Sequence, residues 1–351
     1  MSTEHSSGSS GVGRFHARER RAVRVSRESL VRTRPLLADS TLPHLVEPAT
    51  EQLDLIEWAQ ESHEQIATLL DAHGGVLFRN CGVRSPEHFE RFITAACGAP
   101  LPYTERSSPR SQVAGNIYTS TDQPPEFPIY LHNEQSYNLV FPLRIAFHCV
   151  TAAEEGGATP IADTRRIAGR IAPEIRERFV ERGYMYTRNF GEGFGLSWQD
   201  AFQTSNAAEV EAYCRANDIA CEWKDGDTRL RTRQVRRVMA RHPRTHQTTW
   251  FNHLVFFHVS TLPPDVRQTM ERMVGPDDLP NNTAYGDGSP IEPEVLDHLR
   301  AAYEAETVAF PWQPGDVLLL DNMLASHGRQ PFRGARKVVT AMAMPTRWTD
   351  C

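Results

Sequence analysis

Two histidines and one glutamate in this sequence have the types and the spacing of a metal site. His132 and Glu134 are separated by one residue in the segment LHNEQSY, and His327 follows much later in LLLDNMLASHGR. In a β-strand, side chains two positions apart leave the same face, so His132 and Glu134 could bind one ion together. Two histidines and one carboxylate can hold one face of Fe(II) and leave the other face open for oxygen and substrates. The sequence therefore predicts a metal centre at these three residues.

A second His-x-Glu match, from His88 to Glu90, lies in the segment SPEHFERFITAACG. Ser85 is a typical N-cap, Pro86 suits the first helical position, and apolar residues recur at helical spacing. Side chains two positions apart diverge on a helix, so this match is predicted to be structural. His132, by contrast, follows apolar residues and precedes the strand-like run PLRIAFHCV.

The segment around His327 also contains a group that could bind a carboxylate. A Pro-Gly turn, a buried strand, the histidine, a loop and a return strand follow one another in QPGDVLLLDNMLASHGRQPFRGARKVVTAMAM. Arg336 opens the return strand, and its guanidinium could hold the distal carboxylate of a dicarboxylate cosubstrate with two parallel hydrogen bonds. Its neighbours Arg329, Arg333 and Lys337 are expected to be surface cations.

These motifs resemble those of the TauD/TfdA family of Fe(II)- and 2-oxoglutarate-dependent dioxygenases. Within that family they are similar to the SyrP-type and clavaminate synthase-like members, which have His-x-Glu in place of the commoner His-x-Asp. The matching segments are LHNEQSY, GGATPIADTR, PGDVLLLDNMLASHGR and PFRGARKV, and the likeness runs from roughly residue 40 to the C-terminus.

The resemblance implies a mainly β fold with flanking helices, built on a double-stranded β-helix (jelly-roll) core. It also implies iron at His132, Glu134 and His327, and 2-oxoglutarate at Arg336 and Thr159, the latter a hydroxyl donor to the same carboxylate. Because the related halogenases replace the carboxylate ligand with a small residue, the presence of Glu134 favours hydroxylation.

By the same resemblance, the substrate is expected to be an amino acid, either free or thioester-linked to a peptidyl carrier protein in nonribosomal peptide assembly. Desaturation or epoxidation of a small acid would follow from the same cofactor chemistry and is the alternative. Asn252 and His253 combine polar tips with the apolar wall of the segment WFNH, as small-molecule sites do, and are candidate substrate residues. Arg188 and Arg231 could bind a substrate carboxylate or a phosphopantetheine group, although surface salt bridges are the simpler expectation.

Two other classes of protein fit part of the pattern. A hydrolytic zinc enzyme also uses two histidines and a glutamate with an open position, but it would not need an arginine and a threonine for a cosubstrate. A non-catalytic, cupin-like binding protein could share the fold, because a fold alone does not fix a function. The remaining candidates His148, His242 and His258 are expected to be core histidines and not ligands.

The composition and charge of the chain limit the classes of partner and the cellular location that we expect. The chain has 351 residues and a net charge of −6, which argues against nucleic acid as a general partner. No apolar run approaches the roughly 20 residues that would cross a bilayer, so a soluble protein without a membrane partner is expected. Six cysteines without a C-x-x-C pair favour a reduced, cytoplasmic location.

The chain is expected to begin with a Ser/Gly-rich, then Arg-rich arm over residues 1–34, disordered in part. This arm and the basic run RLRTRQVRR are alternative docking elements for an acidic carrier domain. Residues 35–351 are expected to form one dioxygenase domain with an insertion or lid at about 188–242, and the Ser/Pro/Thr-rich segment 103–128 is expected to be a loop that leads to the metal strand. Apolar periodicity and punctuation predict helices at 53–75, 85–97, 207–218, 263–275 and 291–306, and a strand at 248–259.

Overall fold

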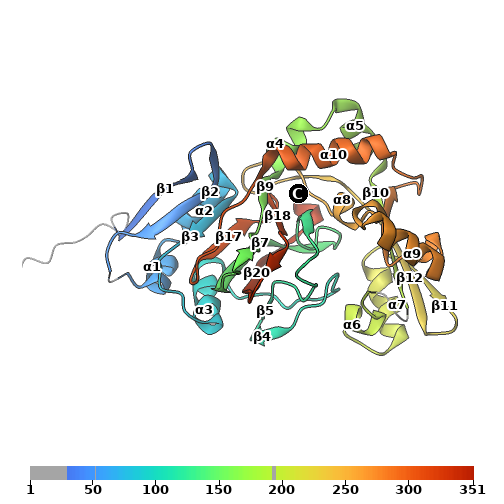
Figure 1. Cartoon of the computed structure of the whole chain (residues 1–351), viewed down its shortest axis with the longest axis horizontal. Helices are drawn as coiled ribbons and strands as arrows, with labels where there is room; N and C mark the ends of the chain where they lie inside the picture. The colour runs from blue at the N-terminus through green and yellow to red at the C-terminus, as the bar shows by residue number, and fades with distance from the viewer. Residues whose placement is uncertain (1–29, 52, 192–194) are drawn as a thin grey trace, which may run out of the picture.

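The structure is a computed structural model that describes residues 30–51, 53–191 and 195–351. Its centre is an eight-stranded sheet in the order β1-β2-β3-β17-β7-β20-β5-β4 (Figure 1). The strands are β1 (Val31–Leu37), β2 (Ser40–Pro48), β3 (Gly75–Phe78), β4 (Gln112–Ala114), β5 (Ile117–Thr119), β7 (Val140–Thr151), β17 (Val317–Asp321) and β20 (Lys337–Arg347). Neighbouring strands are antiparallel, except that β2 and β3 are parallel.

A smaller sheet carries both candidate histidine ligands. Its order is β16-β9-β18-β6, and its strands are β6 (Ile129–His132), β9 (Ile161–Asp163), β16 (Thr307–Val308) and β18 (Ala325–Arg329). One hydrophobic cluster contains Phe147 and Leu318 of the large sheet together with Ile161 and Ala325 of the small one. The two sheets therefore pack face to face.

The central strand β17 shows why its sequence is a continuous apolar run. Leu318 and Leu320 face the small sheet, whereas Val317 and Leu319 belong to the cluster under the N-terminal helices. Since successive side chains of a strand point to opposite faces, a strand covered on both sides needs apolar residues at every position. The sequence prediction of a buried strand at this place is confirmed.

Three helices cover the outer face of the large sheet. They are α1 (Leu55–Glu61), α2 (His63–His73) and α3 (Pro86–Cys97). The side chain of Ser85 caps α3 by accepting a hydrogen bond from the backbone N–H of His88, so the predicted helix over the second His-x-Glu match is confirmed. The helix predicted at 53–75 is two helices, because α1 ends at Glu61 and α2 starts at His63.

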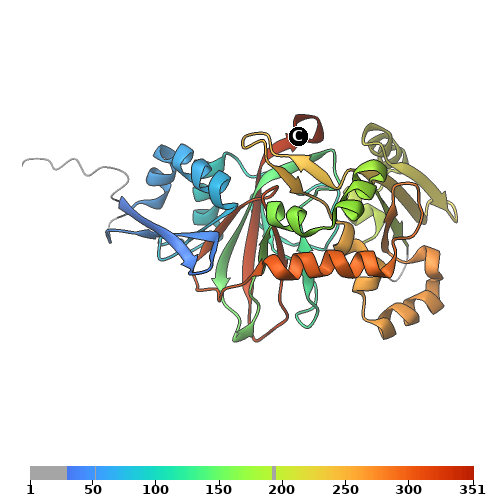
Figure 2. The same ribbon diagram turned by 90° about the horizontal axis from the view of Figure 1, so that it is seen from above.

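A second layer of helices surrounds the small sheet. Figure 2 shows α10 (Pro293–Glu306) running along the molecule, with α4 (Thr164–Arg170) and α5 (Pro173–Arg182) beside it. The short helix α8 (Leu254–Phe257) and the helix α9 (Pro264–Val274) lie nearby, and α9 and α10 confirm two predicted helices. The strand predicted at 248–259 is wrong beyond Trp250, where the chain leaves the strand and then forms α8.

A four-stranded sheet with two helices lies at the end of the molecule opposite the N-terminal helices (Figure 1). It consists of β10 (Tyr184–Phe190), β11 (Ala220–Lys224), β12 (Arg229–Arg236), β15 (Asn281–Tyr285), α6 (Trp198–Phe202) and α7 (Ala207–Ala216). We call these elements the distal unit. The insertion or lid predicted at about 188–242 overlaps most of this unit, which starts at Tyr184 and also includes β15 from later in the chain.

The remaining elements are short. They are β8 (Glu155–Gly156), β13 (Met239–Arg241), β14 (Thr248–Trp250), β19 (Phe332–Arg333) and the 3₁₀ turns η2 (Val259–Thr261), η3 (Pro276–Asp278) and η4 (Trp348–Asp350). Helices and strands occupy comparable parts of the described chain, so the expectation of a mainly β protein is wrong. It underestimated the helices around both sheets.

Residues 1–29 of the predicted arm lie outside the described residues, and the last residues of that arm, from Val31 to Arg34, are part of the edge strand β1. The six cysteines are free thiols. Within the described ranges, none of the helices combines the length and the apolar character needed to cross a membrane.

Candidate metal and cosubstrate site

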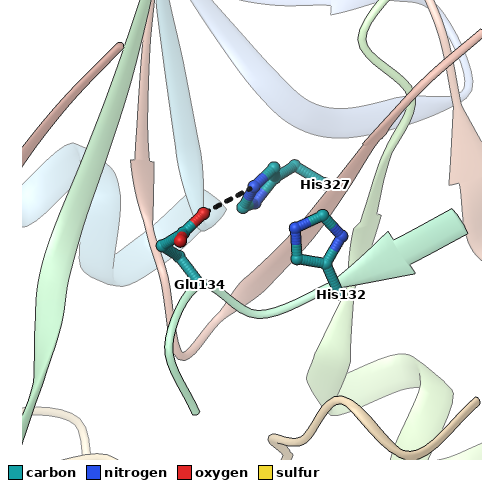
Figure 3. Close-up of side chains that lie close together, drawn as sticks. All are labelled: His132, Glu134 and His327. Carbon is teal, nitrogen blue, oxygen red and sulfur yellow. Dashed lines mark ion pairs between the residues drawn. The ribbon is translucent and has the colours of Figure 1, made fainter. Parts of the chain in front are cut away.

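The structure brings His132, Glu134 and His327 together. His132 ends β6, and His327 lies directly opposite it on the antiparallel neighbour β18. The candidate ligand atoms of the three residues all lie within 4.8 Å of one another, and Glu134 Oε2 is 3.8 Å from His327 Nε2 (Figure 3). All three side chains are buried. Two imidazoles and a carboxylate that converge in this way suit a non-haem iron ion.

The histidine rings are held in place by neighbouring groups. His132 Nδ1 lies 2.8 Å from the carbonyl oxygen of Tyr130, which can only accept a hydrogen bond, so Nδ1 carries the proton and Nε2 is free to bind a metal. The Phe256 ring stacks on His132 at 4.6 Å, and the Phe147 ring lies 5.0 Å from His327. Burial and the nearby His327 lower the pKa of His132 to about 3, so this ligand candidate is a neutral imidazole at ordinary pH.

Asn322, between β17 and β18, fixes the turn that contains Glu134. The Asn322 side chain accepts a hydrogen bond from the backbone N–H of Glu134 at 2.7 Å and donates one to its carbonyl oxygen at 2.9 Å. Asn133 donates in turn to the carbonyl oxygen of Asn322 at 2.7 Å. The turn after β6 and the turn before His327 are therefore joined by side-chain amides. Sequence reasoning missed this role of Asn322, and the only available signal was its place in the same motif as His327.

Arg110 is the second residue that sequence reasoning missed. It comes from the segment 103–128 and donates a hydrogen bond of 2.7 Å from Nη2 to Glu134 Oε2, with side-chain exposures of 5% and 2%. Although burial by itself would raise the pKa of Glu134, Arg110 and the two histidines hold that pKa well below its usual range. Glu134 is thus an ionised carboxylate. The segment 103–128 was expected to be a loop, and it also contains the short strands β4 and β5.

Arg336 and Thr159 line the same cavity as His132 and His327. Arg336 donates from Nε to the carbonyl oxygen of Gly157 at 2.9 Å, which orients the guanidinium. Burial and the nearby Arg329 lower the pKa of Arg336 to about 10, so it remains a cation at neutral pH. This pair fits the distal carboxylate of 2-oxoglutarate.

Thr159 is prepared to donate a hydrogen bond. The indole N–H of Trp312 donates to Thr159 Oγ1 at 3.1 Å, so the hydroxyl hydrogen of Thr159 is free for another acceptor. The sequence reasoning identified Thr159 and did not identify Trp312.

The expectation that Arg329 is a surface cation is wrong. Its side chain is buried and donates hydrogen bonds to the carbonyl oxygens of Gln123, Pro124 and Phe127, at 2.6 to 2.9 Å. Arg329 therefore fixes the end of the segment 103–128 and forms part of the cavity wall. The Arg333 side chain, in contrast, is 84% exposed, as expected.

The four candidate substrate residues are bound to other protein groups, and none belongs to the cavity wall formed by the described residues. Asn252 donates to the carbonyl oxygen of Val238, and His253 Nδ1 lies 2.6 Å from Ser136 Oγ. The His253 ring is 5.0 Å from that of His132, so His253 packs against a candidate ligand without lining the cavity. The apolar part of the wall is formed by Ile129, Phe147 and Phe256 instead.

The two arginine candidates belong to the distal unit. Arg188 donates to the carbonyl oxygen of Arg106 at 2.6 Å and forms an ion pair with Glu105 at 3.8 Å, so the expected salt bridge is present but is buried and not on the surface. Arg231 forms an ion pair with Asp278 and a hydrogen bond of 2.7 Å with Asn189. For Arg231 the simpler expectation, a salt bridge, is confirmed.

Two of the other histidines have ordinary structural contacts. His148 is buried in β7 with Nδ1 3.1 Å from the carbonyl oxygen of Asp316, which agrees with the expected core histidine. His258 is half-buried and lies 2.6 Å from Ser260 Oγ.

Asp71, His242 and Asp321 also lie close enough together to hold an ion. Asp321, however, is already paired with Arg144 and lies 2.9 Å from His242 Nε2. It also accepts two backbone N–H groups, so Asp321 is engaged in a structural network.

Comparison with known proteins adds independent information on the whole chain. The family model described as "Taurine catabolism dioxygenase TauD, TfdA family" matches residues 34–342. The chain is 42% identical over 312 residues to the dapdiamide synthesis protein DdaC of Enterobacter agglomerans, covering 89% of this chain and 94% of that protein. It is 30% identical over 285 residues to a clavaminate synthase-like protein of Arabidopsis thaliana, covering 78% and 83%.

Solved structures show the same fold at low sequence identity. The PvcB protein of Pseudomonas aeruginosa superposes with a TM-score of 0.54 at 16% identity, over 90% of this chain and 94% of that chain. A structure of PvcB, described as an Fe, alpha-ketoglutarate dependent oxygenase from an isonitrile synthetic pathway, gives a TM-score of 0.53 at 17% identity, over 95% and 98%. AAD-2 in complex with Mn(II) and N-oxalylglycine gives 0.52 at 12% identity, over 91% and 99%.

Proposed function

Because this chain belongs to the TauD/TfdA family of non-haem, Fe(II)- and 2-oxoglutarate-dependent dioxygenases, we propose that it hydroxylates an unactivated C–H bond of an amino acid in natural-product biosynthesis. The observation that carries the proposal is one buried cavity that contains two convergent histidines beside a glutamate and, in its wall, Arg336 and Thr159. The similarity to DdaC, a protein named for dapdiamide synthesis, supports the biosynthetic setting.

The proposed ligands of the iron are His132, Glu134 and His327. When it is bound, iron with O₂ and 2-oxoglutarate supplies the oxidation of a C–H bond, while 2-oxoglutarate is converted to succinate and carbon dioxide. Arg336 and Thr159 are proposed to hold the distal carboxylate of 2-oxoglutarate. A zinc hydrolase would need neither of these two residues, and a non-catalytic binding protein would need no such donor set.

The surroundings of the ligands support the same proposal. Phe147 and Phe256 pack against the histidine rings, which excludes water from one side of the cavity. The two face-to-face sheets, with both histidines on the smaller one, are the arrangement expected of a double-stranded β-helix core. In this scaffold both histidine ligands come from paired strands, and Asn322 holds the turn that carries Glu134, which favours a rigid site.

The proposed substrate is a free amino acid or an aminoacyl thioester on a carrier protein. The distal unit offers less free charge for docking than its sequence implies, because Arg231 pairs with Asp278 and Arg233 with Glu222. Of the two proposed docking elements, the arm is therefore the better one to test. Rim charges of this kind chiefly affect association rate and salt sensitivity.

The test is turnover by the iron-loaded protein with 2-oxoglutarate, O₂ and a panel of free and carrier-loaded amino acids. Succinate formation coupled to the gain of one oxygen atom by the substrate supports the proposal, and loss of two hydrogens would identify desaturation. Product NMR separates hydroxylation from epoxidation. Bound zinc without succinate formation would refute the dioxygenase assignment.

The panel also separates the two forms of the substrate. Turnover of a carrier-loaded substrate should fall with ionic strength, because surface charges are screened over about 10 Å. Deleting residues 1–29, which leaves β1 intact, should slow only the carrier-loaded reaction if the arm is the docking element. Efficient and salt-insensitive turnover of a free amino acid, with no gain on loading, would rule out the tethered substrate.

A further inference from the structure

Arg110 has hydrogen-bonding capacity that the protein does not use. Its Nη2 binds Glu134, and its guanidinium lies over the Tyr103 ring at 4.5 Å, but its Nε and Nη1 are buried without a hydrogen-bond partner. A buried donor without a partner destabilises the protein, because its lost contact with water is not replaced. Since Arg110 is part of the cavity wall, a ligand in the cavity can supply the missing acceptor.

The charges of the cavity favour such an acceptor. The described residues of its wall include three arginines, Arg110, Arg329 and Arg336, and no carboxylate, and Glu134 is paired with Arg110. Arg336 is proposed for 2-oxoglutarate, and the Nη groups of Arg329 are bound to backbone carbonyls. Arg329 keeps only Nε without a partner, whereas Arg110 keeps both Nε and Nη1, so Arg110 offers the substrate more donors.

Hydroxyl groups from the same segment surround this position. Ser107, Ser108, Ser120 and Thr121 also belong to the cavity wall. Short hydroxyl side chains can donate or accept hydrogen bonds, so they suit the polar end of a small substrate.

The distal unit holds the segment that carries Arg110. Tyr213 of α7 donates to Glu105 at 2.6 Å, and Arg188 of β10 donates to the carbonyl oxygen of Arg106 at 2.6 Å. The backbone N–H of Arg106 donates to the carbonyl oxygen of Ala201 in α6 at 2.9 Å. These contacts to α6, α7 and β10 fix the chain just before Arg110, so its position is determined before any ligand binds.

We propose that Arg110 anchors the substrate. Its Nη2 binds Glu134 Oε2, and its Nε and Nη1 donate hydrogen bonds to an acyl oxygen of the substrate. The substrate then carries a carboxylate or a primary carboxamide close to the metal ligands. This inference rests on the proposed function and adds a chemical class of substrate to it.

The test uses the whole protein loaded with Mn(II) and N-oxalylglycine, so that no turnover occurs. The probes are succinamate, which has a carboxylate, and succinamide, which has only carboxamides. Mn(II) accelerates the relaxation of nearby probe protons in an NMR titration, so the signal reports binding beside the metal. Wild-type protein should relax at least one probe, and the stronger one identifies the acyl group.

Three variants separate anchoring from other effects. Arg110→Leu should weaken binding of the stronger probe at least tenfold. Arg110→Gln, which keeps a donor and loses the charge, should weaken succinamate far more than succinamide. Arg106→Gln is the matched control, because Arg106 also flanks the Tyr103 ring but is not part of the cavity wall, and it should bind both probes as the wild type does.

Two results would overturn the proposal. One is equal relaxation of both probes by the wild type and Arg110→Leu, or no relaxation by the wild type. The other is failure of both Arg110 variants to load Mn(II), measured by electron paramagnetic resonance, which would mean that Arg110 serves Glu134 alone. Failure of the wild type itself to bind Mn(II) with N-oxalylglycine would instead contradict the proposed function, and the anchor with it.

Discussion

Replacing Arg336 with alanine should weaken 2-oxoglutarate binding and leave metal binding largely intact. Arg336 is proposed to contact the distal carboxylate only, and its Nε is already used by the carbonyl oxygen of Gly157. The two Nη groups are the donors left for the cosubstrate. Because neither contacts the three candidate ligands, the variant should still bind Fe(II).

The expected size of the effect follows from the number of bonds lost. A hydrogen bond to a charged group contributes roughly 1.5–3 kcal/mol, and about 1.4 kcal/mol corresponds to a tenfold change in affinity. Loss of one such bond alone predicts a rise of about ten- to a hundredfold in the 2-oxoglutarate requirement, so loss of both Nη bonds should raise it at least about tenfold. Arg329 also lies in the cavity wall and keeps some positive charge there, which favours the lower end of this range.

Calorimetric titration of 2-oxoglutarate into protein loaded with Mn(II), without O₂, measures this affinity directly. The matched control is Arg333→Ala, because Arg333 is on the same return segment but 84% exposed, and it should bind 2-oxoglutarate as the wild type does. Arg336→Lys, which keeps the charge but not the planar fork, should lie between the wild type and alanine. If Arg333→Ala were the weaker binder and Arg336→Ala the normal one, the assigned carboxylate site would be wrong.

Three further changes test other parts of the site. Glu134→Ala should weaken Fe(II) binding at least about tenfold in a metal titration, since a carboxylate ligand is lost, while Glu90→Ala on α3 should have no effect, and equal binding by both variants would contradict the ligand assignment. Thr159→Ala removes one hydrogen bond to the carboxylate and should raise the 2-oxoglutarate requirement by about 1.5 kcal/mol, or roughly tenfold, which is less than Arg336→Ala, and Trp312→Phe should raise it by less; a normal requirement in Thr159→Ala would exclude its hydroxyl from the site. Asn322→Ala leaves buried peptide groups without partners and should lower the free energy of unfolding by about 2–4 kcal/mol in urea denaturation, and an unchanged midpoint would show that the turn is held by other contacts.

The parts of the site that could be predicted from sequence are those encoded by local spacing. The close spacing of His132 and Glu134 after apolar residues predicted that they share a site, but strand alternation is the wrong reason: β6 ends at His132, and Glu134 lies in a turn that the distant Asn322 holds. His327 and Arg336 likewise lie between a Pro-Gly turn and a return strand with strong apolar patterning. The family resemblance joined these local patterns to Thr159 and gave the cosubstrate.

The parts that were missed depend on contacts between distant segments. Arg110 lies among serines and prolines, and nothing in that segment marks it as the partner of Glu134. Arg329 was misjudged for a related reason, because a cation two positions after a histidine is usually exposed, and its burial depends on a turn that ends near Phe127. Asn252 and His253 were sound candidates by composition, but α8 directs Phe256 into the cavity in their place.

The metal ligands and the segment 103–128 are joined by a continuous set of hydrogen bonds. Glu134 receives its backbone support from Asn322, in the turn that leads to His327, and its outer oxygen is bound by Arg110 from the segment 103–128. That segment is in turn fixed by Arg329 at one end and by the distal unit at the other. Because removing one partner of a buried ion pair is more costly than the pair is stabilising, the charge of Arg110 and the charge of Glu134 depend on each other before a metal is bound. With a metal ion held by His132, Glu134 and His327, the charge of Glu134 would be compensated in part by that ion, and Arg110 would then have charge available for the anionic or amide group proposed for the substrate.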